Sequence, residues 1–190
     1  MITFIKDKDP IWEVENYDVV LVGTSIYSML TNGFQSKIAS KFPEVDEENT
    51  KSPYGDRRKL GTRLTNYNTK PIVSLLFICG YPHSKRVFLD YEALENCLAL
   101  SNAEFKGKKV MMTIIGTTRF DGNGDREKVM EIIEKNTNNM DLYIYDYDQK
   151  DKKLERSEVT KKLCRENYGE YLKYKKAKDF KPYYKKFYLA

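Results

Sequence analysis

The chain has 190 residues, of which 41% are hydrophobic and 13% aromatic, so it can bury one sizeable core and is not an intrinsically disordered protein. No apolar run approaches the roughly 20 residues that span a membrane, and the opening MITFIKDKDP lacks the pattern of a secretory signal. The net charge of +5 is unevenly divided, since residues 1–149 carry 19 Lys and Arg against 22 Asp and Glu, whereas residues 150–190 carry 14 against 6. We therefore expect a mildly acidic body and a basic C-terminal extension, with the boundary near Gln149.

Six short stretches predict β-strands, in chain order at residues 2–5, 18–22, 62–66, 72–79, 110–115 and 142–147, and all of them except 62–66 are mainly apolar or aromatic. The runs at 18–22, 72–79 and 110–115 are continuously apolar, so we expect them to be central strands that are buried on both faces. The short run at 2–5 is expected to form an edge strand.

Three stretches have the apolar periodicity of amphipathic helices, at residues 32–42, 90–105 and 125–136. In the first stretch Phe34, Ile38 and Phe42 recur every four residues on one face, and Pro43 is expected to end the helix. Asp125 is expected to cap the third helix. Helices and strands that alternate in this way predict a three-layer α/β/α fold with a mixed central sheet.

The three cysteines are Cys79, Cys97 and Cys164, an odd number without close spacing. Cys79 and Cys97 stand in apolar contexts, so we expect buried free thiols in a cytosolic protein. Because the chain has one histidine, we expect neither a metal site nor a cofactor.

Two glycine-containing loops follow predicted central strands and lead into predicted helices. They are GTSIYSMLTNGF at residues 23–34 and GTTRFDGNG at residues 116–124. In open α/β sheets ligands bind beyond the carboxyl ends of the strands, and the unpaired N–H groups at a helix start favour an anion. The loops are therefore a candidate site for a phosphate-bearing ligand, although glycines that only bend the chain would give the same pattern. A third loop, at residues 50–61, is rich in charge. Its Arg57, Arg58 and Lys59 could bind an acidic partner or a phosphate, but we expect them to be solvated.

The order and content of these segments resemble the macro domain, the ADP-ribose-binding α/β/α module. DVVLVGTSIYSMLTNGFQSKI is similar to the first ligand loop of that family, in which a strand leads into an N-A-A-N motif and a glycine-rich turn. VMMTIIGTTRFDGNGDREKVMEII is similar to the second, in which a strand leads into a G-T-G-[IV]-[YF]-G turn. The resemblance covers residues 1–148, expected to form one domain, with residues 149–190 as an extension. NGFQ, YGDRRKLGT, DYEALENCL and RFDGNGDREKV are most similar to macro-like proteins of crAss-like tailed phages of Bacteroidota.

The resemblance implies an ADP-ribose-like ligand between the two loops. It places backbone N–H groups near Gly33 and Gly116 at the phosphates, Phe120 on the ribose and Asp9 near the adenine. The full set of ligand-binding candidates is Asp9, Gly23, Thr24, Ser25, Asn32, Gly33, Phe34, Gly116, Thr117, Thr118, Arg119 and Phe120.

Hydrolase activity is not expected from this comparison. Val22, Gly23, Thr24 and Ser25 stand where the family has N-A-A-N, so the asparagine tied to hydrolysis in many macro domains is missing. Asp121 is the one residue in the second loop that could act as a base on an ADP-ribosyl or ADP-ribose-phosphate substrate.

Two functions stay open at this point. One is a nucleotide-binding module in the cytoplasm of an infected bacterium, and the other is a structural or assembly protein of the phage particle that uses the fold as a scaffold. The extension at residues 150–190 contains six tyrosines, and we expect a helix over about 155–176 followed by an extended segment. Its rings and cations could dock on protein or bind nucleic acid, and no membrane partner is expected.

Overall fold

The computed structural model describes residues 1–28, 30–31, 33–80, 87–118 and 121–146, so every expectation for residues 149–190 lies outside the described residues. A six-stranded sheet has the order β1-β6-β5-β2-β4-β3, in which only the β3–β4 pair is antiparallel. The strands are β1 (Ile2–Lys6), β2 (Val19–Ser25), β3 (Arg63–Asn66), β4 (Ile72–Cys79), β5 (Lys109–Thr113) and β6 (Asp141–Asp146). The three strands expected to be central are interior, and β1 is an edge strand, as predicted.

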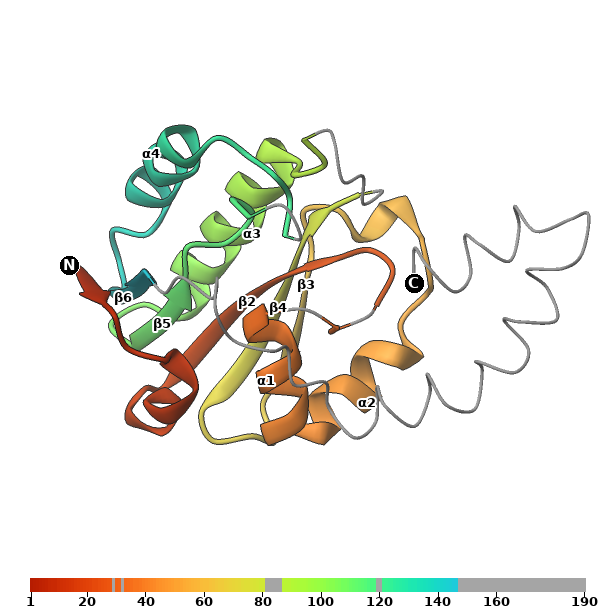
Figure 1. Ribbon diagram of the computed structural model, residues 1–190, viewed down its shortest axis with the longest axis horizontal. Coiled ribbons are helices and arrows are strands. Elements are labelled where there is room, and N and C mark those ends of the chain that lie inside the picture. The colour runs from red at the N-terminus through yellow and green to blue at the C-terminus, as the bar shows by residue number, and fades with distance from the viewer. Residues whose placement is uncertain (29, 32, 81–86, 119–120, 147–190) are drawn as a thin grey trace, which may run out of the picture.

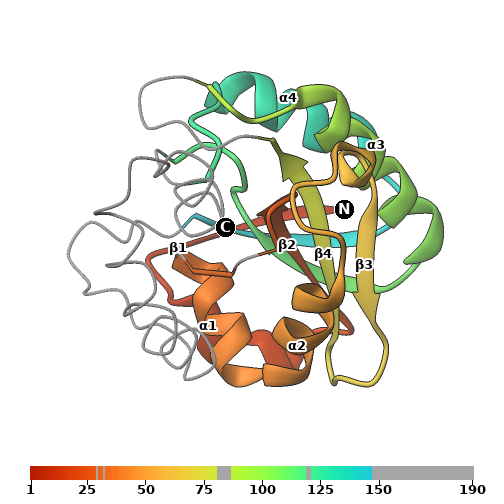
Figure 2. The same ribbon diagram turned by 90° about the vertical axis from the view of Figure 1, so that its right-hand side faces the viewer.

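Helices cover both faces of this sheet, which gives the predicted three-layer α/β/α arrangement (Figure 1 and Figure 2). On one face lie α3 (Tyr91–Glu104) and α4 (Arg126–Asn136), and on the other lie α1 (Gly33–Lys41) and α2 (Pro43–Lys51). Three short 3-10 turns join the strands and helices, namely η1 (Pro10–Trp12), η2 (Val14–Asn16) and η3 (Arg57–Lys59). Within the described residues, no helix is long and apolar enough to cross a membrane.

The domain has a hydrophobic core on each face of the sheet, and strand β2 contributes side chains to both. Val19 and Leu21 enter the core beneath α3 and α4, whereas Val20 and Val22 enter the core beneath α1 and α2. All four side chains are at most 1% exposed. Each such burial stabilises the fold by roughly 1.5–3 kcal/mol, which explains why the sequence of this strand is apolar throughout instead of alternating.

The helices on the α3–α4 face are capped by aspartates. The Asp90 carboxylate accepts a hydrogen bond of 2.9 Å from the Ala93 N–H, and that of Asp125 accepts one of 3.0 Å from the Lys128 N–H. The cap predicted at Asp125 is therefore confirmed, and a cap of this kind contributes about 1 kcal/mol.

Helix α2 was not predicted from the sequence. Pro43 ends the pattern of α1 as expected, but it also begins α2, because proline fits the first position of a helix. The buried residues of α2 are Val45, Asp46 and Asn49, and two of these three are polar. An inward face of this kind has no apolar periodicity, so the expectation of three helices is wrong by one.

Helix α2 buries two polar side chains, and one of them has no hydrogen-bond partner. Both side-chain polar atoms of Asn49 are buried without a hydrogen-bond partner, and the residue is 0% exposed. Burial, together with the charge of Glu47, raises the pKa of Asp46 to about 6. Val45 on this face packs in the core, whereas the unpaired Asn49 amide and the desolvated Asp46 carboxyl reduce the stability that the face provides.

Replacing the unpaired amide should stabilise the protein. Asn49→Leu removes a buried donor and acceptor and keeps the branched shape of the side chain, so we expect the free energy of unfolding to rise by about 1–2 kcal/mol. Urea unfolding followed by circular dichroism measures the change. Asn49→Asp is the matched control, which should lower stability at pH 7 because it buries a charge. A lower stability for Asn49→Leu than for the native protein would contradict this interpretation.

Candidate functional site

The two glycine-containing loops lie together at one edge of the sheet. β2 and β5 are parallel neighbours, so the loops that leave their carboxyl ends emerge side by side. Gln35, in the first turn of α1, bridges them. Its Nε2 donates to the Gly23 carbonyl at 2.7 Å and to Oδ1 of Asp121 at 3.3 Å. Residues 23–34 and 116–124 therefore form one candidate site.

The first three residues of the predicted loop, at positions 23–25, belong to the end of β2. A Cβ atom on Gly23 would lie 2.8 Å from Cδ1 of Ile78 and 3.1 Å from Cβ of Ile115, so packing requires glycine here. Thr24 is 1% exposed and its hydroxyl has no hydrogen-bond partner. Ser25 is half-buried, and its Oγ accepts from the Tyr27 N–H at 3.3 Å. Their role as ligand contacts stays a prediction.

The start of α1 is the part of the first loop that best suits an anion. Gly33 has φ +55°, a left-handed conformation that favours glycine. The Phe34 ring is 7% exposed and packs in the core, so only its backbone can face a ligand. The first turn of α1 has no acidic residue to offset the helix dipole. The candidate Asn32 lies outside the described residues.

The glycines of the second loop are needed for packing against Leu89. A Cβ atom on Gly124 would lie 2.5 Å from Cδ2 of Leu89, and one on Gly116 would lie 2.8 Å from its Cδ1. A Cβ atom on Gly122 would lie 2.6 Å from the Gly116 carbonyl oxygen. The high glycine content of this loop therefore has a structural cause that is independent of any ligand.

Several N–H groups of the second loop already have partners within it. The Gly116 N–H donates to Oδ2 of Asp121 at 2.7 Å, and the Gly124 N–H donates to the Gly116 carbonyl at 2.8 Å. The Thr118 carbonyl accepts from two further N–H groups, at 3.0 and 2.8 Å. The Asp125 side chain also caps the start of α4. The second loop is therefore a less favourable place for an anion than the start of α1.

The other candidates of the second loop are placed as follows. Thr117 is half-buried and its hydroxyl lies 3.5 Å from the Ile114 carbonyl, whereas Thr118 is exposed. Arg119 and Phe120 lie outside the described residues.

Asp121 is the titratable group that joins the loops. Burial raises the pKa of this carboxyl to about 7, while the hydrogen bonds from Gly116 and Gln35 act in the opposite direction. An acid of this pKa can take up or release a proton near neutral pH, which is a property of general acids and bases.

Asp9 lies against the helix that the first loop enters. Its side chain caps η1 by accepting from the Ile11 N–H at 3.3 Å, and it forms an ion pair with Lys37 of α1. Lys37 therefore offsets the charge of the carboxylate that was predicted to contact adenine. The role itself stays a prediction.

The expectation that the basic residues of the 50–61 loop are solvated is wrong for Lys59. Arg57 and Arg58 are exposed, and Arg58 pairs with Asp56, whereas Lys59 is only 8% exposed. A lysine in a charged, turn-rich stretch gives no signal of burial. Its position depends on one acceptor from a distant segment, Ser28, and on two that are close in sequence, Ser52 and Pro53.

No family model and no curated protein matches this sequence. Solved structures of macrodomains do match its fold. The macrodomain of Mycobacterium tuberculosis DarG superposes with a TM-score of 0.60 and 14% identity, over 76% of this chain and 97% of that one. Thermosipho africanus DarTG in complex with ADP-ribose superposes with a TM-score of 0.59 and 12% sequence identity. The match covers 80% of this chain and 43% of that one. A Bacteroides thetaiotaomicron protein of unknown function superposes with a TM-score of 0.57 and 20% sequence identity. The match covers 77% of this chain and 98% of that one.

At these identities the likeness concerns the fold. The chain has a macrodomain fold, as its resemblance to that family implied.

Proposed function

We propose that this protein binds ADP-ribose or a related nucleotide between residues 23–34 and 116–124. The observation that carries the proposal is the adjacency of the two loops at the carboxyl edge of β2 and β5, bridged by Gln35. Helix α1 begins at the same edge without an acidic residue in its first turn, which suits a phosphate. The shared fold with DarTG, which was solved with ADP-ribose, supports the same ligand class.

Within this site the diphosphate lies at the backbone of Gly33 and the start of α1, with Ser25 and Thr118 at its sides. The macro-domain resemblance implies Phe120 at the ribose and the adenine toward Asp9, while Arg119 stays a ligand-binding candidate without an assigned contact.

A charge placed at the start of α1 should abolish binding. Gly33→Glu puts a carboxylate where the proposal places a phosphate, so we expect the affinity for ADP-ribose to fall by at least about 100-fold, or about 2.7 kcal/mol. Isothermal titration calorimetry on the full chain measures it. Gly33→Gln adds the same bulk and backbone strain without the charge, so its affinity for ADP-ribose should fall clearly less. Equal binding by the native protein and both variants would exclude this site.

We further propose that hydrolysis of ADP-ribosyl groups is negligible. Val22 and Ser25 stand where the family's asparagines would position substrate and water, and the Val22 side chain is buried in the core. Asp121 is the remaining candidate base, and its raised pKa suits that task.

An assay with a mono-ADP-ribosylated protein tests this part of the proposal. We expect release of ADP-ribose close to the uncatalysed rate, because the asparagines that would position substrate and water are missing. Any residual rate that uses Asp121 as a base should rise as the pH increases through about 7, where its carboxyl deprotonates. Rapid turnover by the native protein that disappears in Asp121→Ala would show that the protein is a hydrolase.

An assembly role is the second candidate, and exposed aromatic residues near β1 favour it. Trp12 is 82% exposed, and Phe4, on the edge strand β1, is 48% exposed. Large exposed aromatic side chains are frequent anchors of protein interfaces. Strand β6 pairs with β1 up to Asp146, so the last described residue lies beside this edge. We propose that residues 150–190 mediate contacts with protein, in a phage particle or in the cytoplasm of an infected cell.

Truncation at Gln149 separates the possible roles of the extension. If the extension docks on its own domain, the truncated chain should melt several degrees lower, because buried aromatic area stabilises at about 25 cal/mol per Å². If it docks on another subunit, the truncated chain should melt normally but stay monomeric in light scattering. The truncated chain could instead have the melting temperature and the light-scattering size of the full chain and lose only DNA or RNA binding. That result would show that the extension binds nucleic acid.

A further inference from the structure

Lys59 is held between the first loop of the candidate site and the segment at residues 52–59. Its Nζ donates to Oγ of Ser28, to Oγ of Ser52 at 2.9 Å and to the Pro53 carbonyl at 3.0 Å. The two serine hydroxyls are also hydrogen-bonded to each other at 2.8 Å. Three acceptors satisfy the three N–H donors of the ammonium group.

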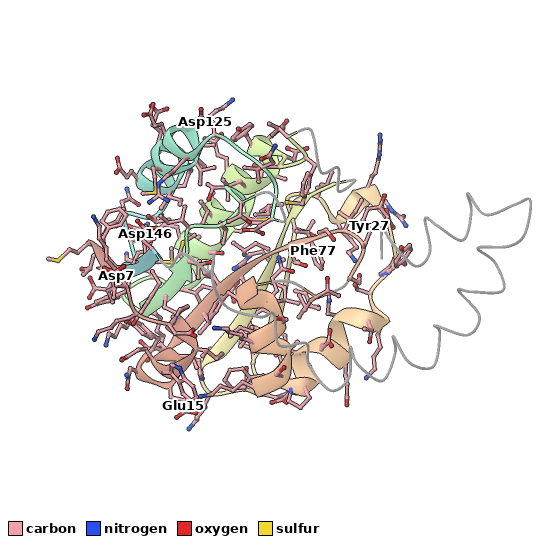
Figure 3. The ribbon with its side chains drawn as sticks, in the orientation of Figure 1. Asp7, Glu15, Tyr27, Phe77, Asp125 and Asp146 are labelled. Carbon is pink, nitrogen blue, oxygen red and sulfur yellow. The ribbon has the colours of Figure 1, made fainter. Side chains whose placement is uncertain are left out.

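This ammonium group is removed from water. Lys59 is 8% exposed, and Nζ lies 4.4 Å from the centroid of the Phe77 ring. Phe77 and Tyr27, labelled in Figure 3, mark the part of the molecule in which the cluster lies. Desolvation lowers the pKa of Lys59 to about 8, partly offset by the charge of Asp56, which itself pairs with Arg58. Among the described residues no carboxylate forms an ion pair with Lys59.

The same segment contacts the first loop at two other points. The Gly55 N–H donates to the Ile26 carbonyl at 3.0 Å, and the rings of Tyr27 and Tyr54 meet edge-on with centroids 5.3 Å apart. Ser28 has φ +56°, which is unfavourable for a serine and persists only where the surroundings hold it. The path of residues 26–28 is therefore held partly by residues 52–59, with Lys59 as the charged contact, and partly by β4, whose Cys79 carbonyl accepts from the Ile26 N–H at 3.0 Å.

We propose that Lys59 is a positioning residue for the ligand site, because its hydrogen bond to Ser28 helps to hold residues 26–28, the part of the first loop that directly follows β2. The proposal rests on the proposed nucleotide-binding function and adds a residue that influences the nucleotide affinity of the site. An anionic ligand at this loop favours the charged form of Lys59 and so raises its pKa. By linkage, nucleotide affinity should then fall as Lys59 loses its proton, between about pH 8 and pH 9.

Two variants isolate the lysine. Lys59→Met keeps the apolar stem and removes the ammonium, and it should fold because it removes a buried charge. Arg58→Met is the matched control, since it removes a positive charge from the neighbouring, exposed position of η3.

Hydrogen exchange without ligand reports the loop contact directly. In Lys59→Met we expect the amide of Gly55, which donates to the first loop, to exchange about tenfold faster, the usual effect of losing a hydrogen bond to a charged group. Arg58→Met should exchange like the native protein. Unchanged protection in Lys59→Met would overturn the positioning role.

Calorimetry with ADP-ribose between pH 7.5 and 9 provides the second measurement, in a window above the pKa of Asp121. We expect Lys59→Met to bind about tenfold more weakly at pH 7.5 and to lose the decline in affinity with pH that the native protein and Arg58→Met show. A variant with native affinity and a native pH profile would overturn the proposal. If the native protein binds no ADP-ribose at any pH, the proposed function fails, and the exchange rates alone decide whether Lys59 holds the loop.

Discussion

Burial of β2 on both faces is the constraint on which the rest of the structure depends. The strand lies between β4 and β5, and its alternate side chains fill two separate cores. Its carboxyl end must therefore emerge in the middle of the sheet edge, next to that of β5. Gly23 lies at this point, where a Cβ atom would collide with Ile78. The same close packing that stabilises the sheet thus leaves only backbone and small side chains at the origin of the first loop.

Polar contacts then hold this loop from two sides. Gln35 ties it to Asp121 of the second loop, and Lys59 ties it to the segment at residues 52–59. Both contacts involve a group whose desolvation costs free energy, and both groups have a pKa moved toward neutrality, to about 7 for Asp121 and about 8 for Lys59. Partly buried charges that persist next to a proposed ligand site are typical of groups that serve binding or chemistry more than stability.

The second loop shows how one pattern can have two causes. Three glycines in a short turn suggested a phosphate-binding loop, yet each of them is required by the approach of Leu89 or of the loop's own backbone. The Gly116 N–H, an expected phosphate donor, is bonded to Asp121. A ligand in this loop has to compete with that internal carboxylate, so the glycine pattern by itself does not establish phosphate binding.

The sequence by itself determined the strands, three of the helices, the cap at Asp125 and the layer order, because apolar periodicity and β-branched runs are local properties of the chain. It also placed the two candidate loops at one edge, since parallel strands end together. Only the tertiary structure decided that α2 exists, that Lys59 is buried and that Asp121 joins the loops. These features depend on polar groups whose partners or surroundings come from distant segments, and such pairings leave no periodic trace in the sequence.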